Sequence, residues 1–201
     1  MAIVRLSSHA TVLATKNKNM SMMHGEHEEL QKVLDKQNVQ QEPEPEEMKI
    51  SLEKPPIFDK ASKLFGVKET DPIFYTYGDT IYSPAKKMPP DDLIVHEQTH
   101  AEQQGYTEEG AKEWWATYFI DPNFRISQEA EAYGLQYRWL CGRHKDRNKR
   151  ARILHELAAF LSSDMYGKAI RHTDAMKLIR DFADGKVIKD LEAYMPEVND
   201  I

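Results

Sequence analysis

A five-residue pattern, His96-Glu97-Gln98-Thr99-His100, constrains this chain more than any other feature. Its two histidines are four residues apart, so on an α-helix they share one face and their imidazoles can converge on one metal ion. Glu97 lies beside them and can take a proton from a water molecule at that ion. The pattern therefore predicts a helix that carries a zinc site. So short a pattern also arises by chance. A third ligand elsewhere in the sequence would distinguish a metal site from a coincidence.

Composition divides the chain into two parts. Residues 1–52 are rich in methionine around 20–23, then acidic and rich in glutamine, and end in a run that includes Glu42-Pro43-Glu44-Pro45-Glu46-Glu47. Such a segment has too few apolar side chains to offset the entropy lost on ordering. We predict a flexible acidic tail over 1–52, available to a protein partner, and one folded domain over 53–201.

The folded domain is predicted to be α+β and mainly helical. A first helix stops at Gly66, and the segments 73–77 and 80–82 with a turn between them predict a small β-hairpin. Asp91 or Asp92 is the expected N-cap of the helix that carries the histidines. The predicted later helices are one capped by Thr107 and ended by Asp121-Pro122, one from Ser127 to about Cys141, one over 147–161 and one capped by Thr173.

A catalytic zinc ion normally takes three protein ligands and leaves one position open, so the two histidines need a companion. The predicted helix after Ser127 offers Glu129 and Glu131, which lie about 200° apart on a helical wheel and cannot face the same ion. Glu129 borders the apolar sector of this helix, where a carboxylate without a cation would be costly to ionise. We therefore favour Glu129 as the third ligand, with Glu131 as the alternative.

These segments together resemble the gluzincin family of zinc metallopeptidases, and most of all the small single-domain metallopeptidases of phages and prophages. The resemblance covers about 55–185 and rests on the HExxH helix with its Gln-rich end, Trp114-Trp115, Asp121-Pro122-Asn123-Phe124-Arg125 and Glu129-Ala130-Glu131-Ala132-Tyr133. It implies a minimal zincin-like domain in which His96, His100 and Glu129 bind Zn²⁺. In gluzincins the third ligand opens a Glu-x-x-x-Asp motif, which supports Glu129 and puts Tyr133 where the acid often stands.

The resemblance and the motif imply hydrolysis of peptide bonds in a peptide or protein substrate, by a zinc-activated water with Glu97 as general base. An endopeptidase is favoured over an exopeptidase. Tyr133 and Tyr166 are the candidates for supporting a ligand or stabilising the oxyanion, and His155 and His172 are further candidates for the oxyanion. Two alternatives stay open: a non-catalytic structural or virion-associated protein that keeps the zinc-binding fold, and a processing protease or toxin held in check by its own acidic tail.

Composition argues against several other classes of protein. The formal net charge of -6 gives no general reason to approach nucleic acid, and the basic run over 143–152 is expected to be a solvated turn. A single cysteine, Cys141, excludes an intrachain disulfide. There is no apolar run of about 20 residues to span a membrane and no apolar core of a secretory signal. We expect a cytoplasmic protein, in the host cytoplasm or the virion if a phage encodes it.

Overall fold

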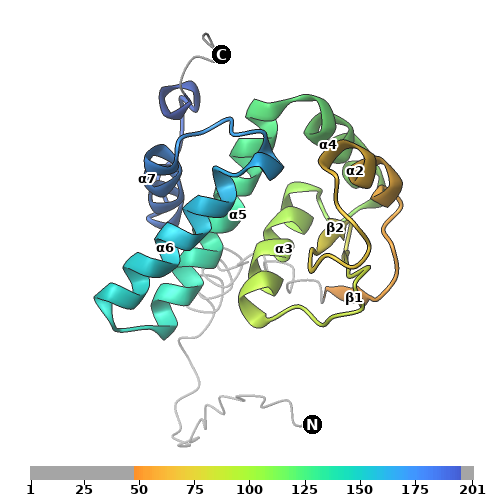
Figure 1. The fold of residues 1–201 in the computed structure, drawn as a ribbon, viewed down its shortest axis with the longest axis horizontal. Helices are drawn as coiled ribbons and strands as arrows, with labels where there is room; N and C mark the ends of the chain where they lie inside the picture. The colour runs from red at the N-terminus through yellow and green to blue at the C-terminus, as the bar shows by residue number, and fades with distance from the viewer. Residues whose placement is uncertain (1–47, 196–201) are drawn as a thin grey trace, which may run out of the picture. The chain divides into compact units, whose positions relative to one another are not determined.

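The computed structural model describes residues 48–195 (Figure 1). Most of the predicted acidic tail and its expected protein partner therefore lie outside the described residues, and so do the last six residues of the chain.

The described part is mainly helical with one small sheet, which confirms the predicted class. The elements are β1 (Lys49–Ser51), α2 (Phe58–Phe65), β2 (Tyr75–Tyr77), β3 (Thr80–Tyr82), α3 (Asp91–Gln103), α4 (Glu108–Ile120), α5 (Pro122–Arg143), α6 (Arg147–Leu161), η1 (Asp164–Tyr166), α7 (His172–Ala183) and η2 (Glu192–Tyr194). Within the described residues, no helix is both long enough and apolar enough to cross a membrane.

The sheet has the strand order β1-β3-β2. Strands β2 and β3 form the predicted antiparallel hairpin, with Tyr77 opposite Thr80. Strand β1 adds in parallel to the other edge of β3, with Ile50 opposite Ile81. Strand β1 lies within the range predicted as the tail, because a three-residue strand is too short to leave a periodic pattern in the sequence.

The start of α5 differs from the prediction. This helix begins at Pro122 rather than after Ser127, and Asp121 is its N-cap, accepting hydrogen bonds from the amides of Asn123 at 2.8 Å and Phe124 at 3.1 Å. Proline suits a first helical position because it has no amide hydrogen to satisfy there. The same Asp-Pro pair that ends α4 therefore starts α5, and Ser127 lies inside the helix.

Other predicted helix ends are partly correct. Thr107 caps α4 as expected, through a 3.0 Å bond from the amide of Gly110. Pro90, not an aspartate, occupies the N-cap position of α3, and Arg171 rather than Thr173 precedes α7. Asp and Thr are also common in a first helical turn, so composition alone places such boundaries only to within a few residues.

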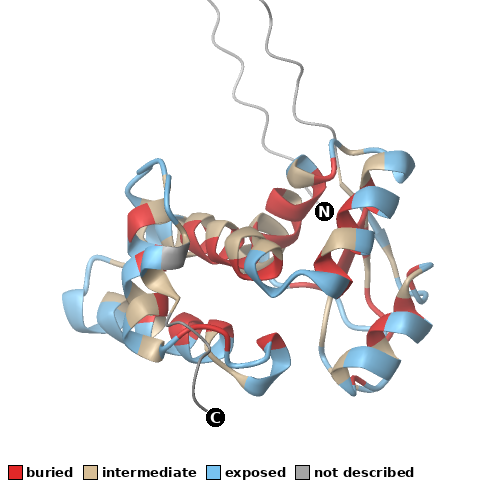
Figure 2. Cartoon of the chain, turned by 90° about the horizontal axis from the view of Figure 1, so that it is seen from above, coloured by how far each residue is buried: buried red, intermediate tan, exposed pale blue. Residues whose placement is uncertain are grey.

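Two apolar clusters flank α3. One joins α2, β2 and the aromatic residues of α4, and the other joins α5, α6 and α7. Helix α3 contacts β2 on one side and α5 on the other. Figure 2 shows buried positions along the facing sides of the central helices and exposed positions on their outer sides. The buried face of α3 carries His96, Glu97 and His100.

Candidate metal centre

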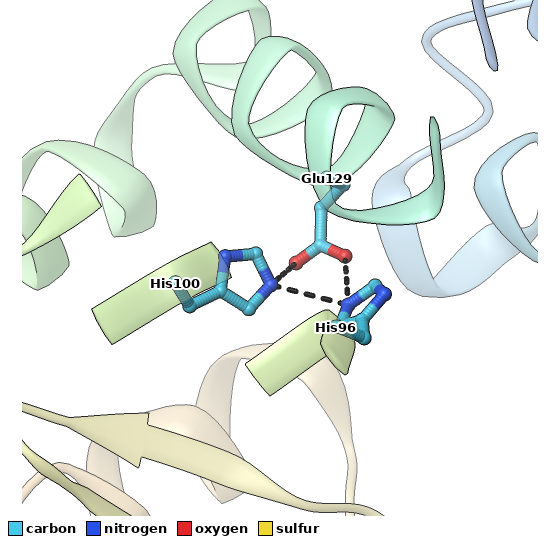
Figure 3. A group of neighbouring side chains, drawn as sticks. All are labelled: His96, His100 and Glu129. Atoms are coloured by element: carbon cyan, nitrogen blue, oxygen red, sulfur yellow. Dashed lines mark hydrogen bonds and ion pairs between the residues drawn. The ribbon is translucent and has the colours of Figure 1, made fainter. Parts of the chain in front are cut away.

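His96 and His100 project from one face of α3, and their Nε2 atoms are 3.2 Å apart. Glu129 of α5 reaches the same point, with one carboxylate oxygen 3.4 Å from the Nε2 of His96 and the other 3.6 Å from the Nε2 of His100. All three side chains are buried and converge on a single point, as Figure 3 shows. The contact between α3 and α5 thus brings together ligands that are 29 residues apart in sequence.

These distances fit a metal ion with tetrahedral coordination. Bonds of 2.0–2.1 Å at tetrahedral angles place neighbouring ligand atoms about 3.3 Å apart. The three observed separations lie between 3.2 and 3.6 Å. Two imidazoles and one carboxylate form the kind of donor set that zinc takes, whereas calcium and magnesium prefer oxygen ligands only. The site therefore fits a divalent transition metal and leaves room for another ligand.

Glu131, the alternative ligand, points elsewhere. Its Oε2 accepts a 3.0 Å hydrogen bond from the amide nitrogen of Gln103, and it is not among the residues that meet at the two imidazoles. Glu129 is 4% exposed, whereas Glu131 is only half-buried. Glu129 and Glu131 thus point in different directions from α5, as their positions on the helical wheel predict.

Two glutamines fix the orientation of the histidines. The Oε1 of Gln103 is 2.8 Å from the Nδ1 of His100, and the Oε1 of Gln136 is 3.2 Å from the Nδ1 of His96. Each amide nitrogen is already committed to a carboxylate, Glu131 for Gln103 and Asp92 for Gln136. Both amide oxygens therefore accept from Nδ1–H, so in the neutral histidines the Nε2 atoms are the ones that can bind a metal ion.

Two tyrosines hold the carboxylate of Glu129. The hydroxyl of Tyr118 donates to Oε1 at 2.6 Å and that of Tyr166 donates to Oε2 at 2.9 Å. Burial is the larger cause and the negative charge of Glu129 the smaller one; together they raise the pKa of both phenols well above the ordinary value. Both hydroxyls therefore keep their protons and remain hydrogen-bond donors. Tyr166, one of the predicted candidates for supporting a ligand, lies in η1 and reaches the centre. Tyr118 lies on α4 among the buried aromatic residues of that helix.

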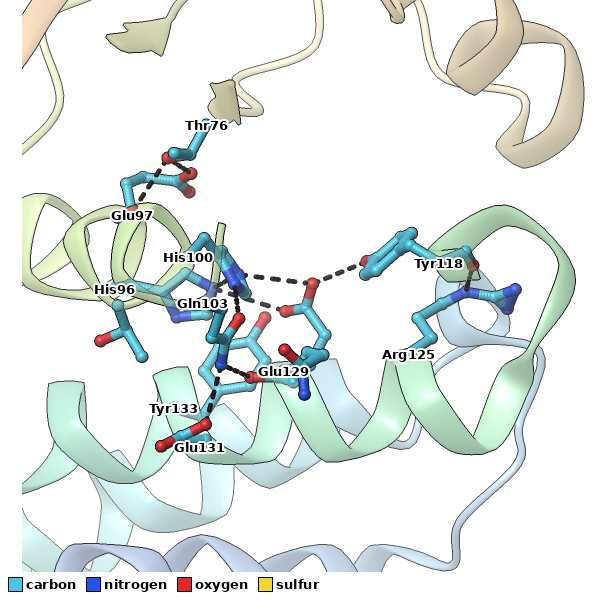
Figure 4. Close-up of polar contacts among 12 residues, drawn as sticks. Thr76, His96, Glu97, His100, Gln103, Tyr118, Arg125, Glu129, Glu131 and Tyr133 are labelled. Atoms are coloured by element: carbon cyan, nitrogen blue, oxygen red, sulfur yellow. Dashed lines mark hydrogen bonds and ion pairs between the residues drawn. The ribbon is translucent and has the colours of Figure 1, made fainter. Parts of the chain in front are cut away.

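Glu97 turns away from the three ligands toward β2 (Figure 4). The hydroxyl of Thr76 donates to the Oε2 of Glu97 at 2.8 Å and also lies 2.9 Å from its backbone carbonyl. The carbonyl of Thr76 accepts from the side chains of Gln104 and Trp115, which fixes this residue of the strand. The sheet therefore positions Glu97, although nothing near Thr76 in the sequence signals this role.

Without a metal ion, the negative charge of Glu129 is balanced by the neighbouring histidines. Burial lowers the pKa of His100, but the neighbouring Glu129 outweighs this effect and raises the pKa to about 9. Burial likewise raises the pKa of Glu129, but His100 and His96 hold it well below the usual range. These shifts favour an anionic carboxylate beside a protonated His100, and a metal ion would have to displace that proton on binding.

The remaining candidates divide into two groups. Tyr133 lies in the centre: its ring is 4.5 Å from that of His96, and its hydroxyl is 3.3 Å from that of Tyr166. His155 and His172 pair with each other instead, with ring centroids 4.3 Å apart, and neither lines the cleft at the ligands. His155 lies on α6 and His172 on α7. The position of a residue on its own helix does not show how far it lies from the centre.

A cleft of about 560 Å³ opens over the candidate metal centre. One wall comes from α2, β2 and the segment before it, with Ile73 and Phe74. The other comes from α5, α6 and η1, with Leu157 and Met165. Trp114 is buried, and its ring centroid lies 5.3 Å from that of His100. The centre is therefore accessible from a mainly apolar cleft that is large enough for several peptide residues.

The structure brings together His96, Glu97, His100, Glu129, Tyr133 and Tyr166, and it adds Thr76, Gln103, Tyr118 and Gln136, which the sequence did not single out. Comparison with protein-family models, with curated proteins and with solved structures finds no match to this chain. The geometry of the centre is therefore the basis for assigning a function.

Proposed function

We propose that this protein is a zinc-dependent peptidase with a minimal, gluzincin-like zincin domain. His96, His100 and Glu129 hold the ion, and Glu97 is the general base. The observation that carries the proposal is the buried triangle of ligand atoms with tetrahedral spacing, beneath a cleft. A buried cluster of two imidazoles and a carboxylate is costly unless it is paired, and a metal ion pairs all three groups at once.

When bound, zinc supplies a Lewis acid that lowers the pKa of water and polarises a peptide carbonyl. Glu97 accepts the proton of the attacking water and passes it to the leaving amine. Thr76 holds the Oε2 of Glu97, which leaves the Oε1 for that proton. Tyr118 and Tyr166 fix the position of Glu129, and the hydroxyl of Tyr133, which also lines the cleft, is the proposed donor to the substrate oxygen.

The test combines metal analysis with one substitution. The purified protein should hold one zinc ion per chain and should hydrolyse unstructured peptides. Glu97→Gln should abolish hydrolysis while the zinc content and the thermal unfolding stay close to those of the wild type. Glu113→Gln removes a carboxylate from an exposed position on α4 and serves as the matched control, with unchanged activity.

Two results would overturn this proposal. A protein that holds no zinc after purification in zinc-containing medium has no metal centre of this kind. If zinc is bound but Glu97→Gln hydrolyses peptides as fast as the wild type does, the ion stabilises the domain without catalysis, as in a structural or virion-associated protein.

A further inference from the structure

The basic segment over 143–152 takes no part in the proposed chemistry. It contains six cations, Arg143, Lys145, Arg147, Lys149, Arg150 and Arg152, against one acid, Asp146, in a chain whose net charge is -6. The structure places it at the turn between α5 and α6, at the lower left of Figure 1. Positive charge is thus concentrated at one end of this helix pair while the chain as a whole is acidic.

Nothing within the described residues neutralises these six cations through an ion pair, whereas cations elsewhere, such as Lys112 and Lys186, do form them. Asp146 is the N-cap of α6 and accepts from the amides of Asn148 at 2.7 Å and Lys149 at 3.1 Å. The first turn of α6 contains no acid, so its cations face the positive end of the helix dipole. That arrangement destabilises a helix by a few tenths of a kcal/mol or more per charge. A gain in stability therefore does not explain why these cations cluster at the N-terminus of α6.

The basic turn is continuous with the cleft over the metal centre. His144 and Lys149 line the same cleft as His96 and Glu97. Glu129 and Arg143 are 14 residues apart on α5, which corresponds to about 21 Å at the helical rise. Lys149 and Leu161 are 12 residues apart on α6, about 18 Å. Because α5 and α6 pack antiparallel on either side of this turn (Figure 1), Glu129 lies about 20 Å along the helix pair from the cations.

The wall between these ends is mainly apolar. Ile153, Leu157 and Phe160 of α6 line the cleft on the same helix face as Lys149. Glu156, in the middle of this wall, is the acid of α6 that lines the cleft. On α6, the positive charge is therefore confined to the end of the cleft that is far from the candidate metal centre. Between the two lies a wall that can bind apolar side chains of a ligand.

We propose that the basic end of the cleft binds acidic residues of an extended polypeptide substrate, about six residues away from the bond that is cut. The six-residue spacing follows because an extended chain advances about 3.3 Å per residue and the span is about 20 Å. This inference rests on the proposed peptidase function and names the class of substrate. A polypeptide fits better than single-stranded nucleic acid, because such strands bind on stacked aromatic side chains and the basic segment contains none.

Binding to the inactive Glu97→Gln variant measures this preference without turnover. The probes are fluorescein-labelled peptides of about twelve residues, long enough to span the cleft, with an alanine- and leucine-rich half and either three glutamates or three glutamines at one end. Both orientations are made. In one orientation the glutamate peptide should bind about tenfold more tightly than the glutamine peptide at low salt, and high salt should remove the difference.

A charge-matched pair of variants localises the effect. Replacing Arg147, Lys149 and Arg150 by glutamine should remove the preference for glutamate. Replacing Lys63, Lys86 and Lys87, three exposed lysines elsewhere, should leave it intact. Thermal unfolding of the first triple variant should not fall, because cations leave the positive end of α6.

Equal binding of the two peptides overturns the inference, and so does an equal loss in both triple variants. Tighter binding of a single-stranded DNA of similar length than of the glutamate peptide would assign the surface to nucleic acid instead. Failure of the peptidase proposal is seen separately, as absence of zinc or of hydrolysis in the wild type, because the charge preference is measured without turnover.

Discussion

The Nδ1 of His96 lies 3.2 Å from the amide oxygen of Gln136, a residue 40 positions later in the chain. The amide nitrogen of Gln136 in turn donates to Asp92 at 2.9 Å, at the start of the helix that carries His96. One side chain of α5 therefore links the first turn of α3 to the histidine one turn further on. The equivalent link to His100 runs through Gln103 to Glu131.

Removing either glutamine should weaken metal binding. Gln136→Leu and Gln103→Leu each leave an Nδ1–H without its acceptor, and the metal affinity should fall about 10- to 100-fold. Competition with a chromophoric chelator measures the change. Gln98→Leu is the control, because Gln98 lies about 200° from His96 around the same helix. Unchanged affinity in both test variants would show that the histidines need no such support.

The two phenols on Glu129 should contribute measurably to stability in the metal-free protein. Tyr118→Phe removes a hydrogen bond to a buried carboxylate and should lower the free energy of unfolding by about 1.5–3 kcal/mol. Tyr75→Phe is the matched control, because the Tyr75 hydroxyl is buried without a hydrogen-bond partner. Its removal should be neutral or slightly stabilising. Urea unfolding in the presence of EDTA compares the two, and equal losses would contradict the assigned bond.

Metal-free stability should depend on pH with a defined sign. In the folded state Glu129 outweighs burial and raises the pKa of His100 to about 9. The ion pair between His100 and Glu129 therefore contributes fully to the free energy of unfolding below about pH 6.5, and this contribution is lost as the pH rises toward 9. The loss is on the order of 3 kcal/mol. The contribution of Glu129, whose pKa is lowered, is lost only in acid. Urea unfolding in EDTA across this range measures the slope, which Glu129→Gln should remove.

Thr76 should affect catalysis without affecting the metal. Thr76→Val removes the hydroxyl that donates to Glu97 at 2.8 Å, so the proposed general base loses its orientation. The rate of peptide hydrolysis should fall roughly 10- to 100-fold, while the zinc content stays at that of the wild type. A parallel fall in zinc content would show instead that Thr76 acts on the fold of the centre.

The close approach of α5 to α7 depends on Gly134. A Cβ at this position would collide with the Cβ of Phe182 and press on the carbonyl oxygen of Ile179 at 3.2 Å. Gly134→Ala should therefore destabilise the protein by about 1–3 kcal/mol. Gly142 lies on the same helix with nothing near its missing Cβ, so Gly142→Ala should stabilise by up to about 1 kcal/mol. Thermal unfolding of the two variants should shift in opposite directions.

Local patterns in the sequence predicted the helical class, the hairpin, the cap at Thr107 and the choice of Glu129 over Glu131. Each of these follows from interactions between residues a few positions apart, such as the spacing of His96 and His100 or the wheel position of Glu129. The start of α5 could not be placed from such patterns, because Ser127 and Asp121 are both good caps and only the packed helix distinguishes them.

The sequence by itself determined which residues have the chemistry and spacing of metal ligands, since ligand chemistry and helical periodicity are local properties. Only the tertiary structure decided what holds those ligands: Tyr118 and Tyr166 on the carboxylate, Gln136 on His96 and Thr76 on Glu97. All four supporting residues lie at least 11 positions from the group that they contact. Such pairs form when packing of the apolar clusters brings α3, α4, α5 and the sheet together, and no periodic pattern within one helix or strand records that contact.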